Sequence, residues 1–256
     1  MGELLKGKNI VIMGLRNKWS IAWGIAESAY KDGANLIVTC QGERERASIE
    51  KLVEELGGCD VYECDISDEK NIDEVFESIK EKNGCIHGLV HAIAHANSED
   101  LQNDFVYTTR EGFLHALDVS AYSLVAVSRK AKDIMTEGGS IITLTYLGSE
   151  KVLPGYNVMG VAKAALEASV RYLAYDLGPD KIRVNAISSG AVKTLSAKGV
   201  KNFSDMLVVS EEKSPLKKRV DLDELGGTAL FYLSDLSKGI TGEVTYVDGG
   251  MNIMGL

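Results

Sequence analysis

The stretch Ser140-Ile-Ile-Thr-Leu-Thr-Tyr146, followed closely by Pro154-Gly-Tyr156-Asn-Val-Met-Gly-Val-Ala-Lys163, contains a predicted strand and the start of a predicted helix. The apolar run predicts a strand with Tyr146 directly at its carboxyl end, and ligands bind at the carboxyl ends of the strands in an open parallel sheet. Tyr156 and Lys163 are seven residues apart, which corresponds to two turns along one helix face. We therefore expect the three side chains to meet at one edge of a sheet.

A lysine beside a tyrosine has a chemical consequence. An ammonium favours the phenolate, so Lys163 is expected to lower the pKa of Tyr156 from its ordinary value of about 10. Such a pair suits the stabilisation of a developing oxyanion beside a nicotinamide. Taken alone, Tyr146 is equally an aromatic packed at a strand end, and Tyr156 an anchor at a helix start. The combination of all three residues favours catalysis.

Apolar runs alternate with helical patterns on both sides of this stretch. The predicted strands are Asn9–Met13, Asn35–Cys40, Asp60–Glu63, Gly88–Ile93, Ser140–Thr145, Arg183–Ile187 and Glu243–Val247. The predicted helices are Ile21–Lys31, Arg44–Leu56, Glu69–Glu81, Arg110–Met135, Tyr156–Gly178 and Leu222–Ser234. This alternation predicts a doubly wound Rossmann fold of the α/β class, with a seven-stranded parallel sheet and helices on both faces.

The length of 256 residues fits a single domain, 1–256, because two domains would need a linker. The chain has only three prolines and shows no serine- and glycine-rich tract, no repeat and no low-complexity segment. Residues 190–220 interrupt the alternation, since they show no strand and few periodic apolar positions. A long irregular stretch in a compact domain is usually functional. We therefore expect a substrate-binding lid at about 190–220.

The acidic composition limits the possible partners. A net charge of −9 and a pI of about 5.1 disfavour nucleic acid, because phosphate binding needs a basic surface. The N-terminal residues show no signal-peptide core, and no run reaches the roughly 18 apolar residues of a membrane helix. The four cysteines form no Cys-x2-Cys pair and are expected to be free thiols. We expect a cytoplasmic protein that binds neither nucleic acid nor membrane.

The end of the first strand has features of a phosphate-binding turn. Gly14 permits a tight turn, Ser20 is a good N-cap, and the helix that begins at Ile21 would direct free N–H groups toward a pyrophosphate. Gly24 would let this helix pack closely on the sheet. The middle glycine of G-x-G-x-x-G is missing, so an ordinary strand–helix turn with a capping serine remains the alternative.

The residues after the second strand bear on cofactor choice. A strand in this position normally ends in an acidic residue that binds the adenosine ribose. Here Gln41 follows the strand, and it can bind a ribose hydroxyl but offers no charge to a 2′-phosphate. Arg44 and Arg46 lie in the next predicted helix, where we expect them to be solvated. The sequence therefore favours NADH, with NADPH as the less favoured cofactor.

The third predicted strand is followed by Cys64-Asp65-Ile66-Ser67. If a dinucleotide binds, Asp65 would accept a hydrogen bond from the adenine amino group while Ile66 packs on the ring. Alternatively, Asp65 or Ser67 is simply the N-cap of the next helix.

Several motifs closely resemble the bacterial enoyl-acyl-carrier-protein reductases, divergent members of the short-chain dehydrogenase/reductase superfamily. These motifs are Gly14-x5-Ser20-Ile21-Ala22, Ser120-Ala-Tyr-Ser-Leu124, Thr143-Leu-Thr-Tyr146-Leu-Gly and the run from Tyr156 through Lys163. The resemblance extends over essentially the whole chain, to Val247-Asp248-Gly249-Gly250. The spacing Tyr-x6-Lys distinguishes this family from ordinary superfamily members, which carry Tyr-x3-Lys, and no Tyr-x3-Lys occurs in the chain.

The resemblance implies hydride transfer from NADH to the β-carbon of a trans-2-enoyl thioester, in the last step of fatty-acid elongation. It implies that Tyr156 stabilises the enolate, that Lys163 holds the nicotinamide ribose and that Tyr146 lines the acyl pocket. The implied cofactor contacts are Gly14, Ser20, Ile21, Gln41, Asp65, Ile66, Ile93, Ala94, Lys163 and Thr194. The implied substrate contacts are Ala96, Tyr146, Tyr156, Met159, Ala197 and Met206, although methionines such as Met206 also suit flexible core packing. The implied assembly is a homotetramer.

Some positions depart from the family pattern. His95 stands where an aromatic residue, usually phenylalanine, is common, and Arg16 and Trp19 occupy positions in the phosphate turn where other residue types are expected. His95 also follows His87 and His91 at a spacing of four, which on a helix would suggest a metal site. These histidines flank and occupy a predicted strand, so we expect no metal.

The implied partner is an acyl-carrier protein that carries the enoyl chain. Acyl-carrier proteins are acidic, and residues 190–220 contain seven basic and three acidic side chains. Complementary charge speeds association, so this segment is a candidate docking surface. The alternative is a solvated loop with accidental charge. In the lid hypothesis, the segment from Thr194 to Val209 closes over the ligands, with Leu195, Ala197, Met206 and Leu207 facing inward.

Three function classes compete at this point. The first is the enoyl reductase, the second a reductase of the same superfamily that acts on a carbonyl, and the third a non-catalytic nucleotide-sensing subunit. The Tyr-x6-Lys spacing argues against the second class, and the intact set of tyrosines and lysine argues against the third.

Overall fold

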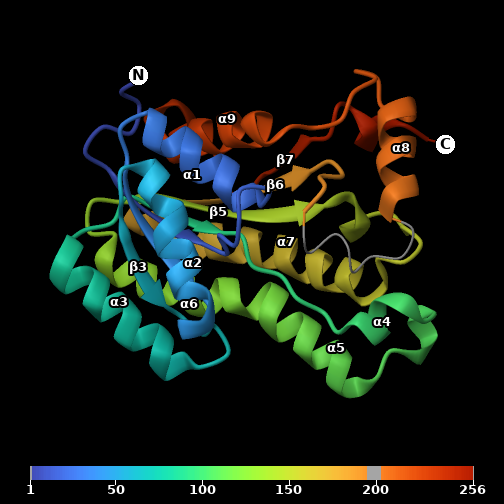
Figure 1. The fold of residues 1–256 in the computed structure, drawn as a ribbon, viewed down its shortest axis with the longest axis horizontal. Helices are drawn as coiled ribbons and strands as arrows, with labels where there is room; N and C mark the ends of the chain where they lie inside the picture. Colours follow the sequence, from blue (N-terminus) through green and yellow to red (C-terminus); the bar gives the residue numbers. More distant parts are fainter. Residues whose placement is uncertain (1, 195–202, 256) are drawn as a thin grey trace.

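A parallel sheet forms the centre of the protein in this computed structural model (Figure 1). The structure describes residues 2–194 and 203–255. Within these ranges the strands are β1 (Asn9–Met13), β2 (Asn35–Cys40), β3 (Asp60–Glu63), β4 (Gly88–His91), β5 (Gly139–Tyr146), β6 (Ile182–Ser189) and β7 (Val244–Val247). They lie in the order β3-β2-β1-β4-β5-β6-β7, and every pair is parallel. The order reverses between β1 and β4, where doubly wound folds bind their ligands.

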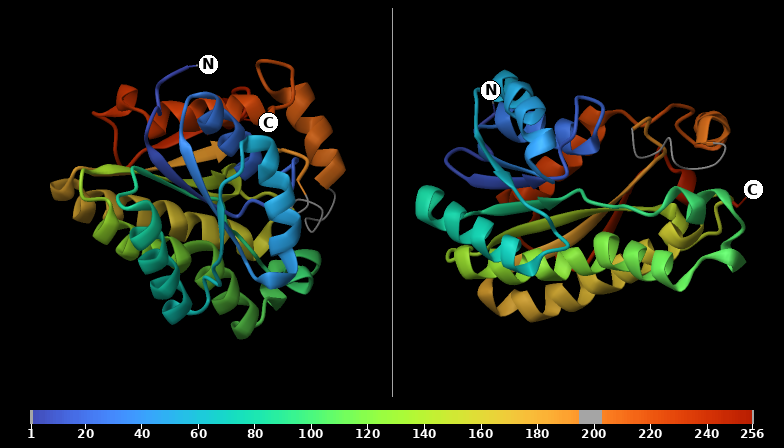
Figure 2. Two further views of the ribbon diagram at one scale, coloured as in Figure 1. Left: turned by 60° about the vertical axis from the view of Figure 1, so that its left-hand side comes forward. Right: turned by 60° about the horizontal axis from the view of Figure 1, so that its bottom comes forward.

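Helices cover both faces of the sheet (Figure 2). One face carries α1 (Ile21–Lys31), α2 (Glu43–Val53) and α9 (Leu222–Leu233), and the other carries α3 (Glu69–Asn83), α6 (Ser123–Ile134) and α7 (Asn157–Leu177). In β1, Ile10 and Ile12 belong to the first core, while Val11 and Met13 belong to the second. Successive side chains of a strand point to opposite faces, so a strand covered on both sides is apolar throughout. The predicted doubly wound α/β fold is confirmed.

The prediction of one continuous helix over Arg110–Met135 is wrong. The structure has α5 (Arg110–Leu117), then a π-helical turn at Asp118–Tyr122, and only then α6. Wider turns of this kind often occur at functional sites. Here the turn presents Ser120, whose hydroxyl accepts from the His95 backbone N–H at 3.0 Å and donates to the His95 carbonyl at 3.1 Å. The irregular turn therefore holds the segment that follows β4.

Two further helices were not predicted, α4 (Ser98–Gln102) and α8 (Phe203–Lys213). The first has five residues and is too short for a periodic signal. The second lies inside 190–220, where we expected irregular structure, and its exposed Val208 and Val209 obscure the apolar face. Among the described residues, no helix is long and apolar enough to cross a membrane.

Gly24 packs against another helix, whereas the sequence predicts that it packs against the sheet. A Cβ at this position would lie 2.8 Å from both the Cβ and the carbonyl oxygen of Leu222, the first residue of α9. The absence of a side chain thus lets α1 and α9 approach closely on their shared face of the sheet.

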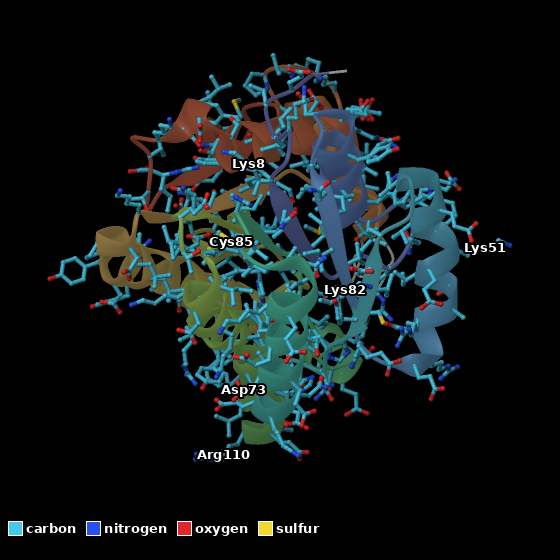
Figure 3. All side chains as sticks on the ribbon, turned by 90° about the vertical axis from the view of Figure 1, so that its left-hand side faces the viewer. Lys8, Lys51, Asp73, Lys82, Cys85 and Arg110 are labelled. Carbon is cyan, nitrogen blue, oxygen red and sulfur yellow. The ribbon has the colours of Figure 1, made fainter. Side chains whose placement is uncertain are left out.

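Figure 3 faces the end of the molecule at which the strands begin, opposite to the end at which they stop. There Lys82 forms an ion pair with Asp60 at 2.5 Å, and Lys8 pairs with Asp235 at 2.9 Å. Ion pairs near the surface contribute about 0–1 kcal/mol each, so these contacts add little to stability. The concave surface relevant to function lies at the other ends of the strands.

Candidate active site

A cavity of about 760 Å³ opens where the strand order reverses, at the carboxyl ends of the strands. Its volume is within the roughly 300–1,000 Å³ typical of small-molecule sites. Most residues that the sequence predicts to bind cofactor or substrate line this cavity. They are Gly14, Ser20, Ile21, Gln41, Ile66, Ile93, Ala94, Ala96, Tyr146, Tyr156, Met159, Lys163, Thr194 and Met206.

Two predicted contacts are not among these lining residues. Asp65 is exposed, and its carboxylate accepts a hydrogen bond from the Ser67 backbone N–H at 3.0 Å, which holds the turn after β3. The alternative that Asp65 or Ser67 caps the next helix is wrong, because Asp68 caps α3 by accepting from two backbone N–H groups. The other predicted contact, Ala197, lies outside the described residues.

The turn after β1 has the geometry of a phosphate site. Gly14 has φ of +88°, and a Cβ there would lie 2.2 Å from the carbonyl oxygen of Ala92, so only glycine fits. Ser20 caps α1 as predicted, because its Oγ accepts from the Trp23 N–H at 3.3 Å. The first N–H groups of an α-helix lack intrahelical partners and attract anions. This turn can therefore hold the phosphates of a dinucleotide.

Lys163 is buried in α7, and its Nζ donates a hydrogen bond to the carbonyl oxygen of Leu144 at 2.7 Å. Burial lowers the pKa of Lys163 to about 8, against an opposing effect of the Glu167 carboxylate. Tyr156 immediately precedes α7, and burial raises the pKa of its phenol above the ordinary value. The expectation that this pKa is lowered is therefore wrong in this structure, because loss of hydration raises it and the neighbouring Tyr146 and Glu167 raise it further.

The two tyrosines of the cavity pack against each other. The ring centroids of Tyr146 and Tyr156 are 5.1 Å apart at an interplanar angle of 72°, an edge-to-face arrangement. Burial and the Asp248 carboxylate raise the pKa of Tyr146 to about 12. Both phenols therefore keep their protons at neutral pH, and each can donate a hydrogen bond to a substrate oxygen.

The end of the cavity near β2 is neither strongly cationic nor strongly anionic. Gln41 and Glu45 line it, and the Arg16 guanidinium donates a hydrogen bond to the Glu45 carboxylate at 2.5 Å. Arg46 is exposed, as expected, but it forms ion pairs with two glutamates at 2.8 and 3.2 Å. The cation at the cavity wall therefore already has a carboxylate partner.

The three regularly spaced histidines serve different purposes. His87 accepts from the Asn9 N–H at the amino end of the sheet. His91 is fully buried, and its ring nitrogens lie 2.9 Å from hydroxyls of Thr143 and Ser123, while burial and the charge of Lys163 lower its pKa to about 3. His95 lines the cavity. In the described part of the chain, no three histidine, cysteine or acidic side chains are grouped so that they could hold a metal ion.

Several residues of the cavity were not predicted from the sequence, and His115 is one of them. His115, in the last turn of α5, lines the cavity, and its Nε2 lies 2.8 Å from Nδ1 of His95. The two rings meet edge to face, with centroids 5.0 Å apart. No pattern in the sequence links the two histidines, because the contact depends on how α5 packs beside the segment after β4.

A Rossmann fold whose phosphate-binding turn opens into a cavity with two phenols and a buried lysine defines a nicotinamide-dependent oxidoreductase of the short-chain dehydrogenase/reductase type. Residues 14–252 match the family model described as enoyl-(acyl carrier protein) reductase. The enoyl-[acyl-carrier-protein] reductase [NADH] FabI of Bacillus cereus is 53% identical over 255 residues, which cover 99% of this chain and 100% of that protein. The chain therefore belongs to the enoyl-acyl-carrier-protein reductase family.

Other relatives differ in their cofactor. The Staphylococcus aureus FabI, named as an NADPH enzyme, is 52% identical over 97% of this chain and 98% of its own length. A crystal structure of the Bacillus cereus enoyl-acyl carrier protein reductase with NADP+ and indole naphthyridinone superposes with a TM-score of 0.98 at 53% identity, covering 99% of this chain and 100% of that chain. The reductase from Anaplasma phagocytophilum in complex with NAD gives a TM-score of 0.97 at 44% identity, covering 100% of this chain and 98% of that chain.

Proposed function

We propose that the protein is an NADH-dependent enoyl-acyl-carrier-protein reductase, which saturates the carbon–carbon double bond of a trans-2-enoyl thioester in the last step of fatty-acid elongation. The observation that carries this proposal is one cavity that contains the Gly14 turn, Tyr146, Tyr156 and Lys163. The activity named for the Bacillus cereus and Bacillus subtilis relatives, each 53% identical, supports it.

The cavity fits a dinucleotide, because the Gly14 turn leaves space where a Cβ would collide and α1 directs its first N–H groups there. When bound, NADH would supply the hydride for the β-carbon of the substrate. Ile66 would pack on the adenine, while Lys163 would donate to the ribose hydroxyls of the nicotinamide half. Ile93, Ala94 and Thr194 would contact the same half. Asp65, which does not line the cavity, would contact the adenine only from beyond the cavity wall.

Tyr156 would donate a hydrogen bond to the thioester carbonyl and stabilise the enolate that forms there. Its raised pKa suits this role, because the phenol must remain protonated to act as a donor. Lys163 would add a positive field behind it, and Tyr146, packed edge to face on Tyr156, would fix the orientation of the ring. Removal of one such donor typically costs about 10²–10³ in rate. Ala96 and Met159 would contact the acyl chain, whose α-carbon is finally protonated.

We infer that NADH is preferred over NADPH. Gln41 offers hydrogen bonds to a ribose but no positive charge, and Glu45 lines the same end of the cavity. A 2′-phosphate would meet the Glu45 carboxylate, and Arg16 would have to leave that carboxylate to bind the phosphate. A kcat/KM that favours NADPH would overturn this inference, and Arg16 and Arg44 would then be the first residues to replace.

The substrate partner would be an acyl-carrier protein that approaches the segment 190–220, which would also act as the lid. Met206 lines the cavity and Leu207 is buried, while Leu195, Ala197, Lys198 and Lys201 lie outside the described residues. The seven basic and three acidic residues leave an excess of +4, which overstates the free charge of this segment because Lys218 is paired with Glu224 outside it. Replacement of both Lys198 and Lys201 by glutamate should still raise KM for the carrier-linked substrate, barely affect a short enoyl-CoA, and matter less at high salt.

The assembly would be a cytoplasmic homotetramer. Tyr172 and Tyr175 on α7 are 75% and 82% exposed, and Ile253 near the C-terminus is 74% exposed. Exposed apolar side chains on two different elements suit two kinds of subunit contact, which a tetramer with dihedral symmetry requires. Light scattering on the purified protein tests this, and a monomer at micromolar concentration would contradict it.

One assay separates the competing functions. Oxidation of NADH, followed by absorbance, is measured with a crotonyl thioester and with an acetoacetyl thioester. An enoyl reductase oxidises NADH only with the first substrate, a carbonyl reductase only with the second, and a sensing subunit with neither. Oxidation with acetoacetyl thioester alone would replace the present proposal by the carbonyl reductase.

A further inference from the structure

The contact between His95 and His115 has no role in the function proposed above. Their facing nitrogens, Nδ1 of His95 and Nε2 of His115, are 2.8 Å apart, and both residues line the cavity. Two nitrogens at this distance must share a proton, because two lone pairs or two N–H groups would repel. In the neutral pair one imidazole therefore donates and the other accepts.

The neutral pair has room for one additional proton. The shared N–H···N bond uses one nitrogen of each ring, so one outward-facing nitrogen carries a hydrogen and the other carries a lone pair. Protonation of that lone pair turns an acceptor into a donor and leaves the shared bond intact. A second additional proton would break the bond. The pair is thus suited to taking up a single proton and gaining one donor.

The pair lies beside the phosphate turn. Ala92, three residues before His95, places its carbonyl oxygen against Gly14, so the segment after β4 runs along the turn. The backbone of His95 is held on both sides by the Ser120 hydroxyl, which fixes its position. Burial, the neighbouring His115 and the charge of Arg16 together lower the pKa of His95 below its ordinary value.

We propose that the His95–His115 pair takes up one proton when a dinucleotide binds and then donates a hydrogen bond to an anionic oxygen of its diphosphate. This inference rests on the proposed function, because it presumes that NADH binds in the cavity. A diphosphate brings negative charge beside Arg16, and so offsets the repulsion between Arg16 and an added proton on the pair. The proton comes from the solvent, so binding of NADH should be linked to proton uptake.

Other charged and titratable groups of the cavity do not account for such an uptake near pH 6.5. Arg16 faces the pair from the turn after β1 and stays charged, while Glu45 on α2 is held by Arg16. Lys163, with a pKa of about 8, is already protonated at this pH. Burial keeps the two phenols and the cavity thiols Cys40 and Cys64 protonated as well, because it raises the pKa of each.

Calorimetric titration of the full-length protein with NADH, in buffers of different ionisation enthalpy, measures the protons taken up per ligand. The parent protein should take up close to one proton near pH 6.5, and its Kd should rise by up to about tenfold per pH unit above that. In the variant His95→Phe an aromatic ring remains at position 95, and in His115→Leu an apolar side chain fills the space of the imidazole. Both variants should take up no proton on binding NADH, and both should bind NADH as tightly as the parent at pH 8.5. His87→Gln, which removes a histidine at the far end of the sheet, should leave the uptake unchanged.

The outcomes separate the two hypotheses. Binding of NADH without proton uptake by the parent, or uptake that persists in either pair variant, would overturn the role of the pair and leave the enoyl reductase standing. Loss of uptake in His87→Gln would also overturn it, because the proton would then be bound elsewhere. Failure of the parent to bind NADH at any pH would contradict the proposed function itself.

Discussion

Replacement of the buried Lys163 by methionine should change how the stability of the protein depends on pH. The pKa of Lys163 is about 8 in the folded protein, against 10.5 for an ordinary lysine. One pKa unit corresponds to about 1.4 kcal/mol, so the buried ammonium costs about 3 kcal/mol at neutral pH. Between these two values the unfolded chain binds more protons than the folded protein. The cost therefore disappears as the pH rises from about 8 to about 10.5.

Methionine is similar in length to lysine but carries no charge, so the variant lacks this cost. Its free energy of unfolding, relative to that of the parent, should fall by about 3 kcal/mol between about pH 7 and about pH 10.5. Urea titrations at one protein concentration, followed by tryptophan fluorescence, measure both proteins. Comparison of the two pH values cancels losses that do not depend on pH, such as the hydrogen bond to Leu144.

A parent–variant difference that stays constant over this range would refute the reasoning, because it would mean that the ammonium is hydrated in the folded protein. Lys51, an exposed residue of α2, provides the matched control (Figure 3). Lys51→Met should show no such pH dependence. In the same pair of variants, the Kd for NADH should increase only for Lys163→Met, since only this residue lines the cavity.

Three further outcomes follow from the geometry. Tyr156→Phe should lower turnover by about 10²–10³ while the Kd for NADH stays unchanged, and wild-type turnover would exclude Tyr156 as the donor. Gly14→Ala should weaken NADH binding and destabilise the fold by about 1–3 kcal/mol or more, whereas Gly58→Ala, with φ of +76° but open space around it, should show the backbone effect alone in urea titrations. The pKa of His91 is lowered to about 3, so stability should decline by about 1.4 kcal/mol per pH unit as the pH falls below about 6.5. His91→Gln should reduce that decline in acid titrations, and an unchanged acid dependence would show that His91 is protonated in the fold.

Local patterns predicted the fold well, because both covered faces of the sheet impose apolar strands. β1, β2, β3 and α1 have the predicted bounds. The predictions were wrong where tertiary contacts override the local preference for helix or strand. The helix predicted over Arg110–Met135 is interrupted because Ser120 must reach the segment after β4, and nothing in the local sequence shows this requirement.

The candidate site was predicted unevenly for the same reason. Residues at or directly after strand ends, such as Gly14, Gln41 and Tyr146, meet at one edge because parallel strands all end there. The direction of the Tyr156 pKa shift was not predictable from spacing, since it depends on burial, which the sequence does not report. His115 lies on a helix with no strand-end signal, and only the packing of α5 shows that it belongs to the cavity.

The charge of Lys163 couples this residue electrostatically to two of its neighbours, His91 and Glu167. Together with burial, it lowers the pKa of His91, so the imidazole stays neutral at physiological pH. Glu167 acts in the opposite direction by raising the pKa of Lys163, and its carboxylate is held by the Thr145 hydroxyl at 2.5 Å. The carboxyl end of β5 thus presents an ammonium among neutral donors, including the Tyr156 phenol, which favours negative charge on a substrate oxygen. Because these residues share one electrostatic field, the effects of replacing Lys163, Glu167 and His91 should not be additive.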